Sequence, residues 1–217
     1  QESAKIKAGL ENIADELKTT TQPDRKISLR HVLDLPSVAD VQISADGQYL
    51  ALSITQRNVS GKKSEKWLEI RSSKSGNLIR SYRGQSEVQS FAWAPQGDLF
   101  AFTATEDEQT TLWTAEFKSG SSTPLVSGLK NFGSFKWAAD ASFIVYSLTK
   151  KPEADKTGLK QLQGLPDHWP TFRNKNVWYK VSRPGGIIQQ ITGGSLSTDV
   201  LDISKNDNRL LLQSTQY

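Results

Sequence analysis

The side chains best suited to do chemistry lie together in one short stretch, from Asp167 to Arg173. It contains an aspartate, the second of two histidines, a tryptophan and an arginine, at Asp167, His168, Trp169 and Arg173. Because the stretch reads as a polar insertion in a loop, these side chains could face a ligand or another domain. Alternatively, the loop folds back on itself and buries Trp169 and Phe172 as a small satellite core. The sequence leaves both interpretations open.

Elsewhere the sequence contains no recognisable catalytic constellation. His31 and His168 are 137 positions apart, so no metal-binding histidine motif exists. A Gly-x-Ser-x-Gly nucleophile elbow and the glycine patterns of phosphate and dinucleotide sites are also absent from the sequence. Glu106, Asp107 and Glu108 are expected at a polar loop tip, where no apolar pocket raises a carboxyl pKa. We therefore expect no catalytic residue, no metal and no cofactor in these 217 residues.

A repeated hairpin must position whatever site exists. From Val41 to Leu52 the chain reads as a strand, an Asp46-Gly47 turn and a second strand. Val41 and Ile43 alternate with polar residues, as a strand with one buried face requires. Asp-Gly is a strong signal for a tight turn, because glycine adopts a positive φ without steric cost.

The hairpin recurs three times further along the chain. The copies begin at Phe91, Phe135 and Leu201, at intervals of 50, 44 and 66 residues, and Gly97 and Asp140 retain parts of the turn. The first two intervals are close to the length of one four-stranded propeller blade.

The rest of each unit repeats as well. A third strand carries a tryptophan at Trp67, Trp113 and Trp178, and a glycine turn, a fourth strand and a closing glycine follow each time. Five of the six tryptophans, all except Trp169, are therefore expected at equivalent places of the repeat. Such regularity predicts a module copied along the chain.

We predict an all-β fold, a partial β-propeller of about three and a half four-stranded antiparallel blades, with a short N-terminal helix. Apolar residues at helical spacing place that helix over residues 4–18. The expected domains are a helical arm over residues 1–25 and an incomplete propeller over residues 26–217. The expected blades are residues 38–84, 85–128, 129–194 and a partial 195–217, with an insertion at about 148–174.

Composition limits the possible partners. The net charge of +4 comes from 27 basic and 23 acidic residues spread along the chain, so we expect no nucleic-acid partner. No run of 18 apolar residues occurs, so we expect no membrane span. The first residue is Gln1 and methionine is absent, so we expect a processed or trimmed product from which any signal peptide has already been removed. Blade four stops at Tyr217, so either further chain covers its open edge or the edge allows self-association.

Two motifs resemble those of a known enzyme family. The hairpins Ser44-Ala45-Asp46-Gly47 and Ala94-Pro95-Gln96-Gly97 resemble the Ser-Pro-Asp-Gly turns of WD40-like propeller repeats in prolyl oligopeptidase family serine peptidases. The stretch from Asp167 to Arg173, followed by Val177-Trp178-Tyr179, is similar to a segment of the dipeptidyl-peptidase-like and acylaminoacyl-peptidase-like members. The opening from Val32 to Val38 also resembles theirs.

This resemblance implies a non-catalytic role. In the family, a propeller covers an α/β-hydrolase domain and admits only short or unfolded peptides, and no residue here matches a catalytic serine, aspartate or histidine. The implied partners are a C-terminal α/β-hydrolase domain of the same parent chain and peptide substrates, in a periplasmic or extracellular setting. The alternative is a stand-alone periplasmic propeller of the TolB type, which carries similar hairpins and mediates binding between proteins.

Overall fold

The computed structural model describes residues 35–57, 64–84, 87–96, 98–151, 174–193, 196–206 and 208–215. The predicted helix over residues 4–18 and the helical arm that contains it lie outside these ranges. So do Gly97 and most of the predicted insertion.

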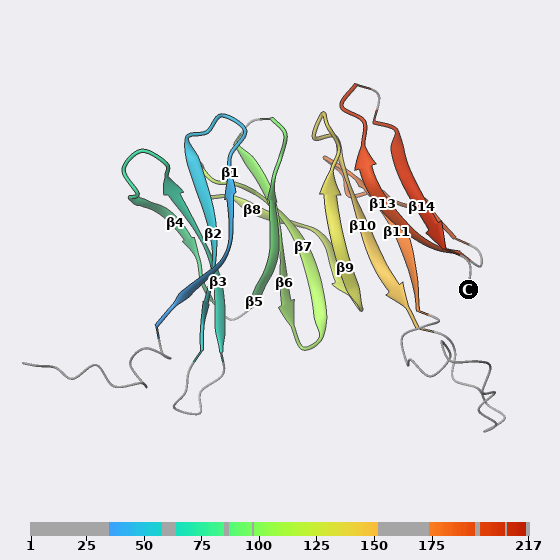
Figure 1. Ribbon diagram of the computed structural model, residues 1–217, viewed down its shortest axis with the longest axis horizontal. Coiled ribbons are helices and arrows are strands. Elements are labelled where there is room, and N and C mark those ends of the chain that lie inside the picture. The colour runs from blue at the N-terminus through green and yellow to red at the C-terminus, as the bar shows by residue number, and fades with distance from the viewer. Residues whose placement is uncertain are drawn as a thin grey trace, which may run out of the picture. The chain divides into compact units, whose positions relative to one another are not determined.

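The described residues form successive antiparallel sheets (Figure 1). Blade one contains β1 (Ser37–Ile43), β2 (Tyr49–Gln56), β3 (Glu65–Ser72) and β4 (Leu78–Tyr82). Blade two contains β5 (Glu87–Trp93), β6 (Leu99–Glu106), β7 (Gln109–Glu116) and β8 (Ser122–Leu129). Blade three contains β9 (Phe132–Trp137), β10 (Phe143–Lys150), β11 (Lys175–Ser182) and β12 (Ile188–Gln190). Blade four contains β13 (Ser197–Ile203) and β14 (Leu210–Thr215). This confirms the predicted fold class, an all-β partial propeller of about three and a half blades.

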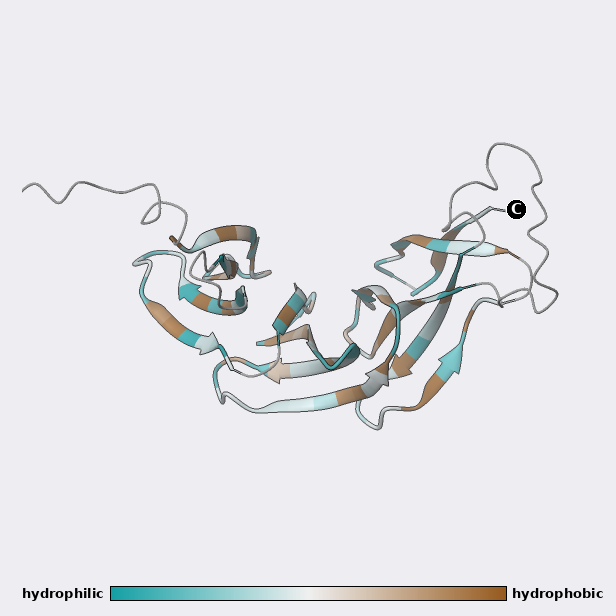
Figure 2. Cartoon of the chain, turned by 90° about the horizontal axis from the view of Figure 1, so that it is seen from below, coloured by the Kyte–Doolittle hydropathy of each residue, from teal (hydrophilic) through white to brown (hydrophobic). Residues whose placement is uncertain are grey.

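The second strand of blades two and three is buried on both faces. In β6 five consecutive residues, from Phe100 to Ala104, are buried, and in β10 the same holds from Phe143 to Ser147. Hydrophobic and hydrophilic residues alternate along other strands (Figure 2), as expected where one face meets solvent. Continuous burial requires a neighbouring blade on each side.

Three apolar clusters fill the interfaces between consecutive blades. Residues at even places of the second strand, such as Phe100 in β6, pack against the preceding blade, with Ile70 of blade one as a partner. Residues at odd places, such as Ala101, pack against the following blade, with Ile144 of blade three as a partner. The third cluster joins Val145 of blade three to blade four. Each blade therefore presents one face to the blade before it and the other to the blade after it.

Side chains of the first strands supply hydrogen bonds between blades. The indole Nε1 of Trp93 donates to the carbonyl of Gln42 in blade one at 3.2 Å. The indole of Trp137, at the equivalent place, donates to the carbonyl of Ala92 in blade two at 3.1 Å.

A second type of hydrogen bond runs from the first strand of a blade to the blade that follows it. The Gln42 Nε2 atom donates to the carbonyl of Phe91 at 3.0 Å, and the Lys136 Nζ atom donates to the carbonyl of Leu201 at 2.5 Å. At the second interface Ala92 stands at the place of Gln42 and Lys136 and has no side-chain donor. At the third interface Ile203 stands at the place of Trp93 and Trp137 and has none either. Each of the three interfaces therefore makes one or both of the two bonds.

The prediction that five tryptophans occupy equivalent places is wrong for the third strands. Trp67 pairs with the sixth residue of β2, Trp113 with the fourth residue of β6 and Trp178 with the fifth residue of β10. Because the side-chain direction alternates along a strand, Trp67 and Trp113 lie on the same face of their blades, which in blade two meets the preceding blade. Trp178 lies on the opposite face, which meets the following blade. Accordingly, Trp178 Nε1 donates to the carbonyl of Thr198 in blade four at 2.7 Å.

We predict that Trp137→Phe lowers the free energy of unfolding by about 1–3 kcal/mol, because it removes a donor from a largely buried carbonyl and leaves a void. Urea unfolding followed by circular dichroism measures the change. Trp113→Phe is the matched control: among the described residues its indole nitrogen makes no hydrogen bond. Equal losses for the two variants would show that the hydrogen bond contributes nothing beyond packing.

Candidate functional site

The stretch expected to carry chemistry cannot be placed. Asp167, His168, Trp169 and Arg173 all lie outside the described residues, and that Trp169 and Arg173 lie together on one rim of the blades stays a prediction. The strands that flank them are described: Lys150 at the end of β10 pairs with Lys175 at the start of β11.

The repeat residues Asp46 and Asp140 hold the hairpin turns. The Ser44 hydroxyl and the Gln48 amide donate to Asp46 Oδ1 at 2.6 and 3.1 Å, and these two bonds lower the pKa of that carboxyl. The Ser142 hydroxyl and amide donate to Asp140 Oδ1 at 2.6 and 3.0 Å and likewise lower its pKa. Both carboxylates therefore stabilise a turn.

Blade three has an alanine in place of the turn glycine, and a residue of blade four stabilises its turn. Gly47 has a φ of 71°, whereas the equivalent Ala141 has a φ of 58°, which is unfavourable for a residue with a Cβ atom. The side-chain Nδ2 of Asn208 in blade four donates a hydrogen bond to Asp140 Oδ2 at 2.9 Å. Its Oδ1 atom accepts a hydrogen bond from the backbone amide of Ala139 at 3.1 Å. The following blade thus supports this turn from outside.

The acidic loop of blade two is a tight turn. Asp107 and Glu108 have φ values of 47° and 63° between β6 and β7, and both are exposed.

Among the described residues, no group of three histidine, cysteine or acidic side chains could hold a metal ion. In the same ranges, no helix is long and apolar enough to cross a membrane.

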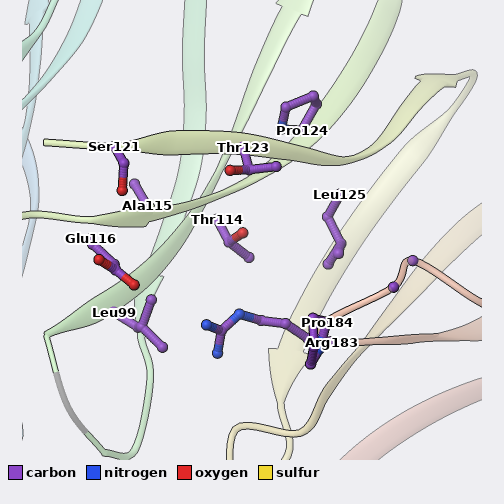
Figure 3. Close-up of a pocket in the computed structure, with 12 residues that line it drawn as sticks. Leu99, Thr114, Ala115, Glu116, Ser121, Thr123, Pro124, Leu125, Arg183 and Pro184 are labelled. Atoms are coloured by element: carbon purple, nitrogen blue, oxygen red, sulfur yellow. The ribbon is translucent and has the colours of Figure 1, made fainter.

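A cavity of about 530 Å³ lies between blades two and three. Figure 3 shows the guanidinium of Arg183 directed into the space between Leu99, Thr114 and Leu125. The Glu116 carboxylate lies at the rim and accepts a hydrogen bond from the Ser119 hydroxyl at 3.2 Å. The lining offers a cation, a carboxylate, hydroxyl groups and apolar carbon. These groups can bind a ligand through hydrogen bonds and apolar contact.

Reasoning from sequence missed this cavity. It identified the Gly185-Gly186 turn from its glycines and did not consider the arginine that precedes it. Alignment of the three turns would have given a signal, because Arg183 stands where blade two has the buried Phe117.

Comparison with solved structures identifies the fold class. No protein-family model matches the chain, and no curated protein sequence does. Acylaminoacyl peptidase from Pyrococcus horikoshii is 15% identical, with a TM-score of 0.62 over 87% of this chain and 32% of that chain. The β-propeller domain of the trilobed protease from Pyrococcus furiosus is 15% identical, with a TM-score of 0.54 over 76% of this chain and 45% of that chain. The fold is a β-propeller.

A third peptidase shows the same likeness. The AtxE2 isopeptidase is 12% identical, with a TM-score of 0.50 over 86% of this chain and 38% of that chain. At these identities the likeness concerns the fold alone. The chain spans about a third of the length of the acylaminoacyl peptidase that it matches.

Burial also perturbs a tyrosine in the core between blades two and three. Tyr146 stacks on Tyr179 with ring centroids 5.5 Å apart. Desolvation, reinforced by the electrostatic effect of Tyr179, raises the pKa of Tyr146 to about 12. An unfolded tyrosine ionises near pH 10.

We predict that this difference destabilises the protein in alkali. Above pH 10 the unfolded chain releases the Tyr146 proton while the folded chain retains it, so stability falls as the pH rises from 10 towards 12. Tyr146→Phe keeps the ring and should show a shallower decline in the free energy of unfolding between pH 8 and pH 11. Parallel pH profiles for the two proteins would contradict the assignment.

Proposed function

We propose that this chain is the non-catalytic propeller portion of a secreted serine peptidase, where it gates and docks peptide substrates for an α/β-hydrolase domain of the same parent chain. The observation that carries the proposal is the likeness to acylaminoacyl peptidase, with a TM-score of 0.62 over 87% of this chain. The trilobed protease propeller gives independent support, since it is likewise a propeller domain of a protease.

The outer faces of the described blades favour a larger propeller. Val41 in β1 is 52% exposed, whereas its equivalents Phe91 and Phe135 are 6% and 9% exposed against a preceding blade. At the other end, Leu211 in β14 is 59% exposed, whereas its equivalent Ala51 is 1% exposed against a following blade. Exposed apolar surface of this kind marks an interaction site. We expect further blades to cover both faces.

We assign catalysis and peptide contact to different parts of the parent protein, according to the side chains that each part carries. In the described residues the carboxylates of Asp46 and Asp140 hold turns, and we assign the catalytic chemistry to another domain. The inserted stretch with Asp167, His168, Trp169 and Arg173 is the part we assign to contact with peptide or with the hydrolase. A periplasmic or extracellular location and a dipeptidyl-peptidase-like specificity belong to this proposal.

We predict that the isolated 217-residue chain hydrolyses no fluorogenic peptide and is not labelled by a fluorophosphonate probe. The parent gene, read past the codon for Tyr217, should encode further blades and then a Gly-x-Ser-x-Gly motif. A stop codon after about six blades, without that motif, would overturn the peptidase assignment and favour the stand-alone binding propeller. Fluorophosphonate-sensitive cleavage by the isolated chain would overturn the non-catalytic role.

A further inference from the structure

The cavity at Arg183 results from three departures from the repeat. At the interface between blades one and two, Phe117 fills the corresponding place and is 2% exposed. Its ring lies 4.3 Å from that of Tyr49 and 5.5 Å from that of Trp93, measured between centroids. This aromatic contact closes the first interface at its turn end.

Arg80 of blade one completes the closure. Its Nε atom donates to the carbonyl of Phe117 at 3.1 Å, and its guanidinium lies so close over Gly120 that a side chain there would collide with it. Gly120 also has a φ of 77°. The Arg80 side chain therefore bridges blade one to the turn of blade two.

The second interface has different residues at the same three places. Arg183 replaces Phe117: each donates its backbone amide to the carbonyl just before the second strand of its own blade, at Ser142 and Asp98 respectively. Leu99 replaces Tyr49 as the first residue of a second strand. Smaller or more polar side chains now face one another across the gap.

The third replacement removes the bridging cation. Arg80 pairs with Ile70 in blade one, and Thr123 pairs with the equivalent Thr114 in blade two. Thr123 is too short to reach the turn of blade three. Together the three replacements leave the space of about 530 Å³ open, which is within the size range of small-molecule sites.

Three polar groups in this space have no partner of their own. Within the described residues, the guanidinium of Arg183 makes no hydrogen bond or ion pair, and neither do the hydroxyls of Thr114 and Thr123. Arg183 is half-buried, so part of its hydration is already lost. A guanidinium presents a planar fork of donors that matches a carboxylate with two parallel bonds.

We propose that this cavity binds a ligand through a single carboxylate held by Arg183, with the hydroxyls of Thr114 and Thr123 as further donors. Glu116 at the rim repels a second negative charge and accepts an amide N–H, which disfavours phosphates and nucleotides. The carboxylate belongs to a peptide C-terminus or to a free organic acid. The assignment rests on the cavity alone and holds whether or not the chain serves a peptidase.

Titration of the ¹⁵N-labelled 217-residue chain tests the proposal, with N-acetyl-alanyl-alanine, its C-terminal amide, acetate and inorganic phosphate as probes. The free acid should shift the amide signals of Gly185 and Gly186, and the C-terminal amide should bind at least tenfold more weakly. Acetate binding as tightly as the peptide acid would assign the cavity to organic acids. Tighter binding of the peptide acid would assign it to peptide C-termini, and both outcomes support the carboxylate site.

Variants separate the site from general charge. Arg183→Gln should weaken binding of the free acid at least tenfold. Lys118→Gln removes one positive charge from the corresponding turn of blade two and should change the affinity less than twofold. Thr123→Phe should fill the space with an uncharged ring and abolish binding while the remaining signals keep their dispersion.

Three results would overturn the proposal: equal binding of acid and amide, tighter binding of phosphate than of the acid, or wild-type affinity in Arg183→Gln. If Arg183→Gln fails to fold, undiminished binding by a folded Thr123→Phe variant would overturn it equally.

Discussion

The hydrogen bonds between first strands are the constraint on which the assembly of blades depends. In the described residues, no strand of one blade pairs with a strand of another, so backbone bonding alone would leave four separate sheets. Apolar burial draws the sheets together but is not directional. The indoles of Trp93 and Trp137 and the side chains of Gln42 and Lys136 donate to specific carbonyls of neighbouring blades and so fix which residues meet.

Because each blade contacts its immediate neighbours, the interfaces can vary independently. The first interface is closed by Phe117 and Arg80, and the second leaves the cavity at Arg183 open. The third relies on Trp178, whose indole bonds to blade four. One module, copied along the chain, has thus produced three interfaces that differ in their side-chain contacts.

Much of the fold could be predicted from the sequence, because its signals are local. The Asp46-Gly47 turn and the alternation around it lie within a dozen residues, and their recurrence predicts blades. The register of the third-strand tryptophans could not be predicted in the same way. A shift of one residue between Trp113 and Trp178 reverses the face to which the indole points, and only strand pairing reveals it. The cavity was harder to predict, because Thr123 and Arg183 are 60 positions apart in the sequence and line the same space only at the interface between two blades.

The Asn208 contact to the turn of blade three has an architectural consequence. A hairpin that keeps its own glycine is self-sufficient, whereas this one holds Ala141 in a left-handed conformation that is unfavourable by about 1–2 kcal/mol. Its shape therefore depends partly on Asn208, which lies 68 residues after Asp140 in the turn between β13 and β14. During synthesis on the ribosome, blade three would emerge before Asn208, which stabilises its turn. At the growing end of the propeller, the newest complete blade would therefore become rigid only when part of the next blade has been made.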